Sequence, residues 1–208
     1  YTITSSAGES SPVEEGGQIT FTITRSGTGS ASTVYVATNA TNDTATHDSD
    51  FTHIASLTLN FESNETVKTV TVNTLSDSVY EETEYLFFML FKTEEAVDPA
   101  VFDYAAFTTG FIKNTTTLTS SLSSSASSVD EGQTVTFTLA TNAAEDTAFG
   151  WTISGVSSAD VSGDLTGTAT VDANGDATIG VTLVSDATTE GSETMTLSVA
   201  SQSSSVTI

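Results

Sequence analysis

The stretch VEEGGQITFT at residues 13–22 returns as VDEGQTVTFT at residues 129–138. A second signature, a Ser-Asp pair followed by two glutamates, also occurs twice. Its acids are Asp77, Glu81 and Glu84 in the first copy and Asp186, Glu190 and Glu193 in the second. Two signatures that repeat in the same order indicate tandem modules. Because 208 residues suffice for two domains that each bury a core, we expect domains over residues 1–114 and 115–208.

Apolar and polar residues alternate with a period of two through both halves. Ile19, Phe21 and Ile23 alternate with threonines, and residues 135–139 repeat the pattern. This period places one set of side chains on a core face and the other set outward, as in a half-buried strand. Short strands of this kind, separated by Gly, Asn, Asp and Ser turns, predict an all-β fold of two antiparallel sandwiches.

Three segments need a separate interpretation. Residues 94–104 are the one short helix candidate, and Pro99 interrupts it. The apolar run at residues 87–91 is either buried on both faces of a sheet or supports an interface. Residues 120–128 are low in complexity but, with Leu122, are expected to hold the first strand of the second domain.

The charge balance is strongly acidic, since 27 Asp and Glu against 4 Lys and Arg give a formal net charge of −23. All four basic residues lie before residue 114, so the second domain carries neither Lys nor Arg. Binding to nucleic acid or to an anionic membrane surface needs clustered basic residues, and both are therefore excluded. No apolar run approaches the ~20 residues of a membrane span, so no membrane insertion is expected. Charge of this size attracts cations.

The absence of cysteine excludes disulfides and thiolate metal sites. Two extracellular domains without disulfides suit a bacterial or viral surface. Because the chain starts at Tyr1 and stops at Ile208 within an alternating run, we expect a fragment of a longer protein. No Gly-x-Ser-x-Gly elbow and no cysteine are present, and neither histidine has a neighbouring serine in a recognisable nucleophile context, so the protein is not expected to be an enzyme.

The first half resembles the Calx-beta domain of sodium/calcium exchangers, integrin β4 and many bacterial surface proteins. The resemblance is carried by VEEGG at residues 13–17, FTITRSG at 21–27, SDF at 49–51 and the acids from Asp77 to Glu84. The second half is similar but divergent, with Asp160 in the nearest substitute for the SDF element. The resemblance implies an immunoglobulin-like sandwich of seven strands in each domain, whose loops at one end bind Ca²⁺.

The resemblance also implies which residues hold the ion. In the first domain these are Glu15, Asp50, Asp77, Glu81 and Glu84. In the second domain they are Glu131, Asp160, Asp186, Glu190 and Glu193. Calcium takes about 6 to 8 oxygen ligands from carboxylates, carbonyls and water, which suits such a set. Calcium-binding members often carry an acidic run after the last strand, whereas Lys113 and Asn114 follow Ile112 here.

Other interpretations of single residues stay open at this point. The acids could form a solvated rim that binds no ion. His47 and His53 beside Asp48 suggest a transition-metal site, but two histidines without a third nitrogen or sulfur ligand support it poorly. Trp151 could stack on a sugar, although such a residue more often belongs to a core.

We expect a calcium-binding adhesion or structural module of a large extracellular bacterial surface protein, in which Ca²⁺ stiffens the loops and the junction between modules. The expected partners are neighbouring modules of the same protein or assembly, and a cell-surface or glycan partner is open. Alternatives are a structural or decoration component on the surface of a marine phage virion, and a non-catalytic accessory module of a secreted hydrolase.

Overall fold

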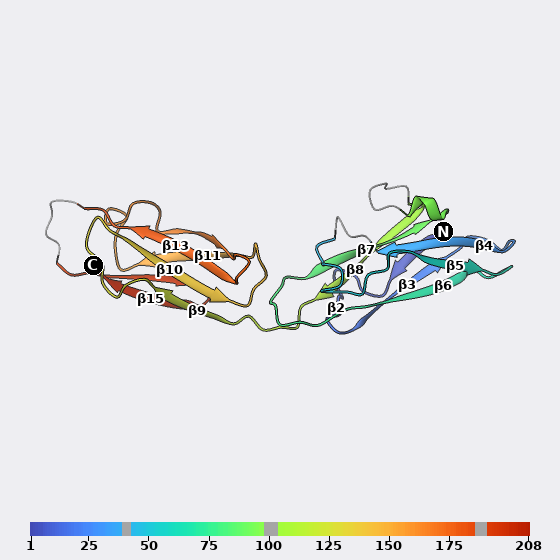
Figure 1. The fold of residues 1–208 in the computed structure, drawn as a ribbon, viewed down its shortest axis with the longest axis horizontal. Helices are drawn as coiled ribbons and strands as arrows, with labels where there is room; N and C mark the ends of the chain where they lie inside the picture. The colour runs from blue at the N-terminus through green and yellow to red at the C-terminus, as the bar shows by residue number, and fades with distance from the viewer. Residues whose placement is uncertain (39–42, 98–103, 186–190) are drawn as a thin grey trace. The chain divides into compact units, whose positions relative to one another are not determined.

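The computed structural model describes residues 1–38, 43–97, 104–185 and 191–208, and Figure 1 shows it as a ribbon. The chain divides into two compact units. The first comprises Tyr1–Ser78 and Glu82–Thr116, and the second comprises Thr117–Ile208 with the short segment Val79–Glu81. Each unit is a β-sandwich, so the predicted all-β class with two tandem sandwiches is confirmed.

The first unit consists of two sheets. One sheet has the order β1–β3–β6, formed by β1 (Thr2–Ser5), β3 (Gln18–Thr24) and β6 (Val67–Asn73). The other has the order β2–β8–β7–β4–β5, formed by β2 (Val13–Glu14), β8 (Ala106–Lys113), β7 (Glu84–Phe91), β4 (Ser32–Thr38) and β5 (Leu57–Phe61). Neighbouring strands are antiparallel except β2 and β8, which run parallel.

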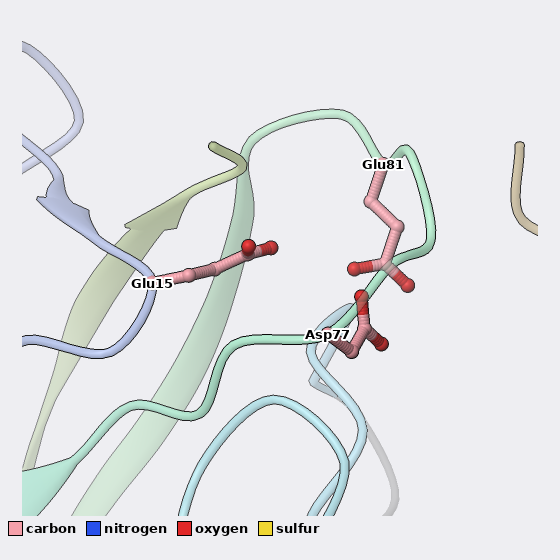
Figure 2. A group of neighbouring side chains, drawn as sticks. All are labelled: Glu15, Asp77 and Glu81. Atoms are coloured by element: carbon pink, nitrogen blue, oxygen red, sulfur yellow. The ribbon is translucent and has the colours of Figure 1, made fainter. Parts of the chain in front are cut away.

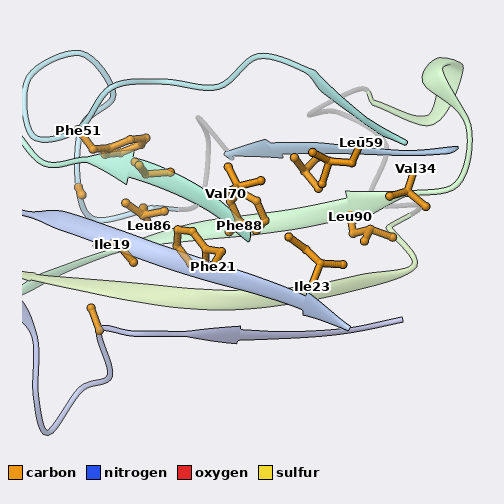
Figure 3. Packing of buried hydrophobic residues seen from close by; sticks show 14 of the residues in the cluster. Ile19, Phe21, Ile23, Val34, Phe51, Leu59, Val70, Leu86, Phe88 and Leu90 are labelled. Carbon is orange, nitrogen blue, oxygen red and sulfur yellow. The ribbon is translucent and has the colours of Figure 1, made fainter. Parts of the chain in front are cut away.

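The alternation seen in the sequence fills the core between these sheets. Ile19, Phe21 and Ile23 of β3 are fully buried and face residues of β7 (Figure 3). Phe21 and Phe88 stack with their ring centroids 4.2 Å apart. Gly110 of β8 leaves room for this pair, because an added Cβ would lie 2.9 Å from Cζ of Phe21.

Strand β7 is buried on both faces, which supports one of the two alternatives for the apolar run at residues 87–91. Leu86, Phe88 and Leu90 belong to the main core. On the opposite face, Met89 and Phe91 form a small cluster with Ala37. Tyr35 and Tyr104 pack against that cluster.

Of the helix candidate at residues 94–104, the described residues show a short 3₁₀ turn at Glu94–Ala96. The backbone is irregular at Val97 and Tyr104, and residues 98–103 lie outside the described residues. Within the described ranges, no helix is long and apolar enough to cross a membrane.

The second unit also has two sheets, and all neighbouring strands are antiparallel. One sheet has the order β13–β10–β9, formed by β9 (Ser120–Ser124), β10 (Thr134–Thr141) and β13 (Asp176–Thr182). The other has the order β12–β11–β14–β15, formed by β11 (Ala148–Ser154), β12 (Thr166–Thr170), β14 (Thr194–Val199) and β15 (Gln202–Thr207). The strand expected within residues 120–128 is therefore confirmed as β9.

The second unit has a hydrophobic core of its own, in which Phe137, Leu139 and Met195 are fully buried. Trp151 of β11 packs against this core and across Gly167, where an added Cβ would lie 2.4 Å from Cζ2 of the indole. This packing supports the core interpretation of Trp151 over the sugar-stacking one.

Because the two cores are separate, a cavity in one should leave the other stable. We expect Phe88→Ala to destabilise the first unit by about 3–5 kcal/mol, the usual cost of deleting a buried phenylalanine ring. Trp151 is the chain's single tryptophan and lies in the second unit, so its fluorescence reports unfolding there. Thermal unfolding followed by calorimetry and by tryptophan fluorescence should show a lowered first transition and an unchanged fluorescence midpoint. Phe137→Ala is the matched control and should reverse the two effects; coincident shifts in either variant would argue against separate cores.

Candidate metal centre

A tight turn brings the first signature against the second. Gly16 has φ +75°, and a Cβ at this position would lie 2.6 Å from Oγ of Ser76, the residue before Asp77. The turn is closed by a hydrogen bond from the Gly17 N–H to the Glu14 carbonyl. Only glycine takes this backbone conformation and this close approach without cost. Glu15 is thereby held beside the loop that carries Asp77.

A third loop delivers Asp50, whose side chain is only 5% exposed. The Thr46 N–H donates to Oδ2 of Asp50, and the Leu75 N–H donates to the Asp50 carbonyl at 2.8 Å. These bonds attach the loop of the SDF element to the chain just ahead of Asp77.

The acids of these loops converge, as Figure 2 shows for Glu15, Asp77 and Glu81. Ligand oxygens of these three residues all lie within 4.8 Å of one another. A second group joins Asp50, Glu81 and Glu84 within the same limit. Glu81 belongs to both groups, so the five acids that the sequence assigns to the first domain form one continuous cluster.

Carboxylates at this spacing repel one another, by about 3 kcal/mol for a pair 4.8 Å apart in an effective dielectric near 20. Two of the four basic side chains are engaged elsewhere, since the Arg25 guanidinium and the Lys68 ammonium lie 5.5 and 6.0 Å from the ring centroid of Phe61. The cluster offers only oxygen ligands, and several of them are partly exposed. Oxygen ligands suit Ca²⁺ better than they suit softer metals, which prefer nitrogen or sulfur.

The segment that leaves β8 is hydrogen-bonded to the same cluster. The Glu15 N–H donates to the Lys113 carbonyl at 3.1 Å. The N–H and the hydroxyl of Thr115 donate to Oε2 of Glu15 at 3.4 and 3.3 Å, and the Thr116 hydroxyl donates to the Asp77 carbonyl at 3.0 Å. Thr115 and Thr116 are not predicted as site residues, because two threonines in a Thr- and Ser-rich stretch carry no distinctive signal.

The second unit repeats part of this arrangement. Gly132 has φ +78°, and its added Cβ would lie 3.2 Å from Cβ of Ser185, the residue before Asp186. Glu131, Asp160 and Glu193 line one small cavity of about 20 Å³, roughly the space that one water molecule needs. The Ser157 N–H donates to Oδ2 of Asp160 at 2.6 Å. Three of the five predicted ligands therefore share a cavity, while Asp186 and Glu190 lie outside the described residues.

The transition-metal alternative gains no support from the described residues. The rings of His47 and His53 lie with their centroids 5.0 Å apart, but no group of three ligand atoms within the described part of the chain includes them. Nδ1 of His53 is instead hydrogen-bonded to the Thr38 hydroxyl at 2.9 Å. Burial lowers the pKa of His53, with a smaller contribution from the charge of His47.

Asp43 lies in the same loop as Asp50, and its carboxyl is perturbed. Burial raises the pKa of Asp43 to about 7, against the smaller lowering effects of the hydrogen bond from the Phe87 N–H and of the charge of His47. Oδ1 accepts the Phe87 N–H at 3.0 Å, whereas Oδ2 is buried without a hydrogen-bond partner among the described residues. The sequence offers no sign of this, since Asp43 stands in a polar loop.

Comparison with known proteins matches the Calx-beta domain family twice, at residues 3–115 and 113–207. Comparison with curated protein sequences finds no match. Among solved structures, the chain is similar to the calcium binding domain CBD12 of CALX1.1, with 18% identity and a TM-score of 0.40 over 90% of this chain and 76% of that chain. CBD12 from CALX1.2 is similar with 15% identity and a TM-score of 0.38, over 95% and 79% of the two chains. The Escherichia coli adhesin FdeC is similar with 16% identity and a TM-score of 0.40, over 100% of this chain and 62% of that chain.

The close approach of the two signatures can be tested at Gly16. We expect Gly16→Ala to destabilise the first unit by more than the ~1–2 kcal/mol that a left-handed backbone costs a non-glycine residue, because its Cβ would also collide with the Ser76 hydroxyl. In a Ser76→Ala background the nearest remaining atom is Cβ of residue 76 at 3.9 Å, so only the backbone cost should remain. Gly27→Ala is the matched control, since Gly27 has φ +81° with nothing within 4 Å. Equal losses for Gly16→Ala and Gly27→Ala in denaturant titrations would refute the collision.

The raised pKa of Asp43 predicts a pH dependence of stability. The folded-state pKa of about 7 exceeds the unfolded value of 3.8, so the folded state binds this proton more tightly. The resulting stabilisation is complete below about pH 4 and is lost as the pH rises through about 7. Urea unfolding of the first unit in chelator should therefore show stability falling between about pH 4 and pH 7, with little further change above that range. Asp43→Asn keeps an oxygen for the Phe87 N–H and cannot ionise, so it should remove this part of the slope, whereas the exposed control Glu9→Gln should keep it.

Proposed function

The chain belongs to the Calx-beta family, and we propose that its first domain binds Ca²⁺ through Glu15, Asp50, Asp77, Glu81 and Glu84. One observation carries the proposal: these acids come from three separate stretches of sequence and meet in two overlapping groups, each within 4.8 Å. Family membership supports the same ligands independently, because the resemblance assigns the ion to the loops that hold them.

The side chains have distinct parts in the proposed site. Glu81 can contribute to both groups, so it is the residue on which a shared or a paired ion position depends. Asp50 is the buried anchor, while Glu15 and Asp77 close the site from the turn at Gly16 and from the Ser76 loop. Bound Ca²⁺ would supply the positive charge that offsets the repulsion among these carboxylates.

The proposal extends to the second domain with a smaller ligand set. Glu131, Asp160 and Glu193 line a common cavity, and Asp186 and Glu190 remain predicted ligands. Because this domain has no Lys or Arg, no internal salt bridge with those residues can neutralise its acids. We therefore expect cation uptake by both domains, and tighter uptake by the first.

The biological role that fits such a site is structural. Ca²⁺ that binds the folded unit and not the unfolded chain stabilises the fold by mass action and orders the loops. The chain leaves the first unit at Thr116, whose hydroxyl is bonded to the Asp77 carbonyl, so ordering of the site also orders the start of the connection. We therefore propose a calcium-stiffened adhesion or spacer module of a larger extracellular surface protein, with neighbouring modules as its partners.

Calorimetric titration of Ca²⁺ into the chelator-treated chain tests the proposal. We expect saturable uptake, and Glu81→Gln should weaken binding to the first domain by at least tenfold, since it removes one carboxylate from both groups. Glu82→Gln changes the neighbouring, exposed acid and should leave the affinity within about twofold. The thermal midpoint of the first unit should rise with Ca²⁺ in the unaltered chain and hardly at all in Glu81→Gln.

Two outcomes would overturn the proposal. No heat and no thermal shift in the unaltered chain would leave the acids as a solvated rim. Equal losses in Glu81→Gln and Glu82→Gln would attribute uptake to diffuse negative charge instead of a site. Small-angle scattering in Ca²⁺ and in chelator examines the spacer role separately, because a stiffened chain should show a narrower distribution of dimensions.

A further inference from the structure

The segment after β8 is neutral, yet it contacts the acids of the proposed site. Asn114, Thr115 and Thr116 carry no charge. The segment is held in shape by a hydrogen bond from the Thr116 N–H to Oδ1 of Asn114. Its outward polar groups then meet Glu15 and the backbone of Asp77.

The contacts converge on one oxygen of one predicted ligand. Both donors of Thr115, the N–H at 3.4 Å and the hydroxyl at 3.3 Å, reach Oε2 of Glu15. The backbone of Glu15 is held from the same side, by its N–H bond to the Lys113 carbonyl at 3.1 Å. Glu15 is therefore restrained at both ends of its side chain, and its carboxylate is aimed at the other acids (Figure 2).

We propose that Thr115 is a positioning residue for the calcium site, whose two donors hold Glu15 by Oε2 while the carboxylate stays beside the other acids. This inference rests on the proposed function. A glutamate side chain loses rotamer freedom when it becomes a ligand, and a partner that has already ordered it lowers that cost. Partners of this kind around metal ligands typically change metal affinity by about 10–100-fold.

The neutral character of the segment has a second consequence. An acid at position 115 would add a ligand but would also repel Glu15 when no ion is bound, whereas threonine donates to Glu15 in that state. Thr115 therefore favours an ordered ion-free site with fewer negative charges. The residue at position 115 therefore affects two quantities: the stability of the ion-free first unit, and the increase in that stability when Ca²⁺ binds.

Three variants test the positioning role in the full chain, with Ca²⁺ titrations followed by calorimetry. Thr115→Val keeps the shape but loses the hydroxyl donor, and we expect about a tenfold weaker affinity of the first domain. Thr115→Ser restores the donor and should return the affinity to within about twofold of the unaltered chain. Thr117→Val, at an exposed threonine two residues on, should have no effect. An unchanged affinity in Thr115→Val, or no rescue in Thr115→Ser, would overturn the inference.

Thr115→Asp distinguishes a residue that faces the site from one with only a structural role, because an added carboxylate changes the response of the thermal midpoint to Ca²⁺ only if it lies at the site. We expect a lower thermal midpoint in chelator and a larger rise on adding Ca²⁺ than in the unaltered chain. Unchanged values for both would show that position 115 does not face the site. If the unaltered chain takes up no Ca²⁺, the proposed function itself fails; if it does and Thr115→Val binds equally well, only the role of Thr115 fails.

Discussion

The first sandwich depends on how closely a glycine turn can approach a neighbouring loop. A Cβ built at Gly16 would lie only 2.6 Å from Oγ of Ser76, so the two stretches can approach this closely only with glycine at this position. A side chain there would push apart the two stretches that carry Glu15 and Asp77. Gly132 lies in the same way against Ser185 in the second sandwich, with more room. The repeated Glu-Gly and Ser-Asp pairs are thus two halves of one packing contact.

This contact brings several carboxylates together, and the hydrophobic core must offset their mutual repulsion for the loops to stay folded. The core holds the two sheets together through the stacked rings of Phe21 and Phe88 and their neighbours. The sheets in turn fix the ends of the loops that carry the acids. The acids repel one another, while hydrogen bonds from Thr46, Thr115 and Thr116 hold individual groups in place. The fold therefore maintains a cluster that its own electrostatics oppose, which is the arrangement expected of a cation site.

Alternation and spacing made much of this predictable. The alternation of Ile19, Phe21 and Ile23 with threonines predicts a half-buried strand. The two repeated signatures point to Glu15, Asp77, Glu81 and Glu84, which the structure brings together. Contacts between stretches distant in sequence were not predictable in this way. Thr115 reaches Glu15 across 100 residues. Asp43 accepts the Phe87 N–H of β7 across 44 residues. The 3₁₀ turn at Glu94–Ala96 shows the same limit, because Ala96 packs against the cluster of Ala37, Met89 and Phe91, a contact that the local sequence does not reveal.

The parallel pairing of β2 with β8 bears on how such a unit would respond to tension. Val13 lies opposite Ile112 and Glu14 opposite Lys113, so a strand near the start of the unit runs alongside the strand that ends it. A pull on the two ends would slide these strands past each other and strain their hydrogen bonds simultaneously, as shear, instead of opening them one by one. Ser128 and Thr207 form an equivalent parallel bridge in the second unit. Both sandwiches thus contain a parallel contact to their last strand that would resist such a pull by shear.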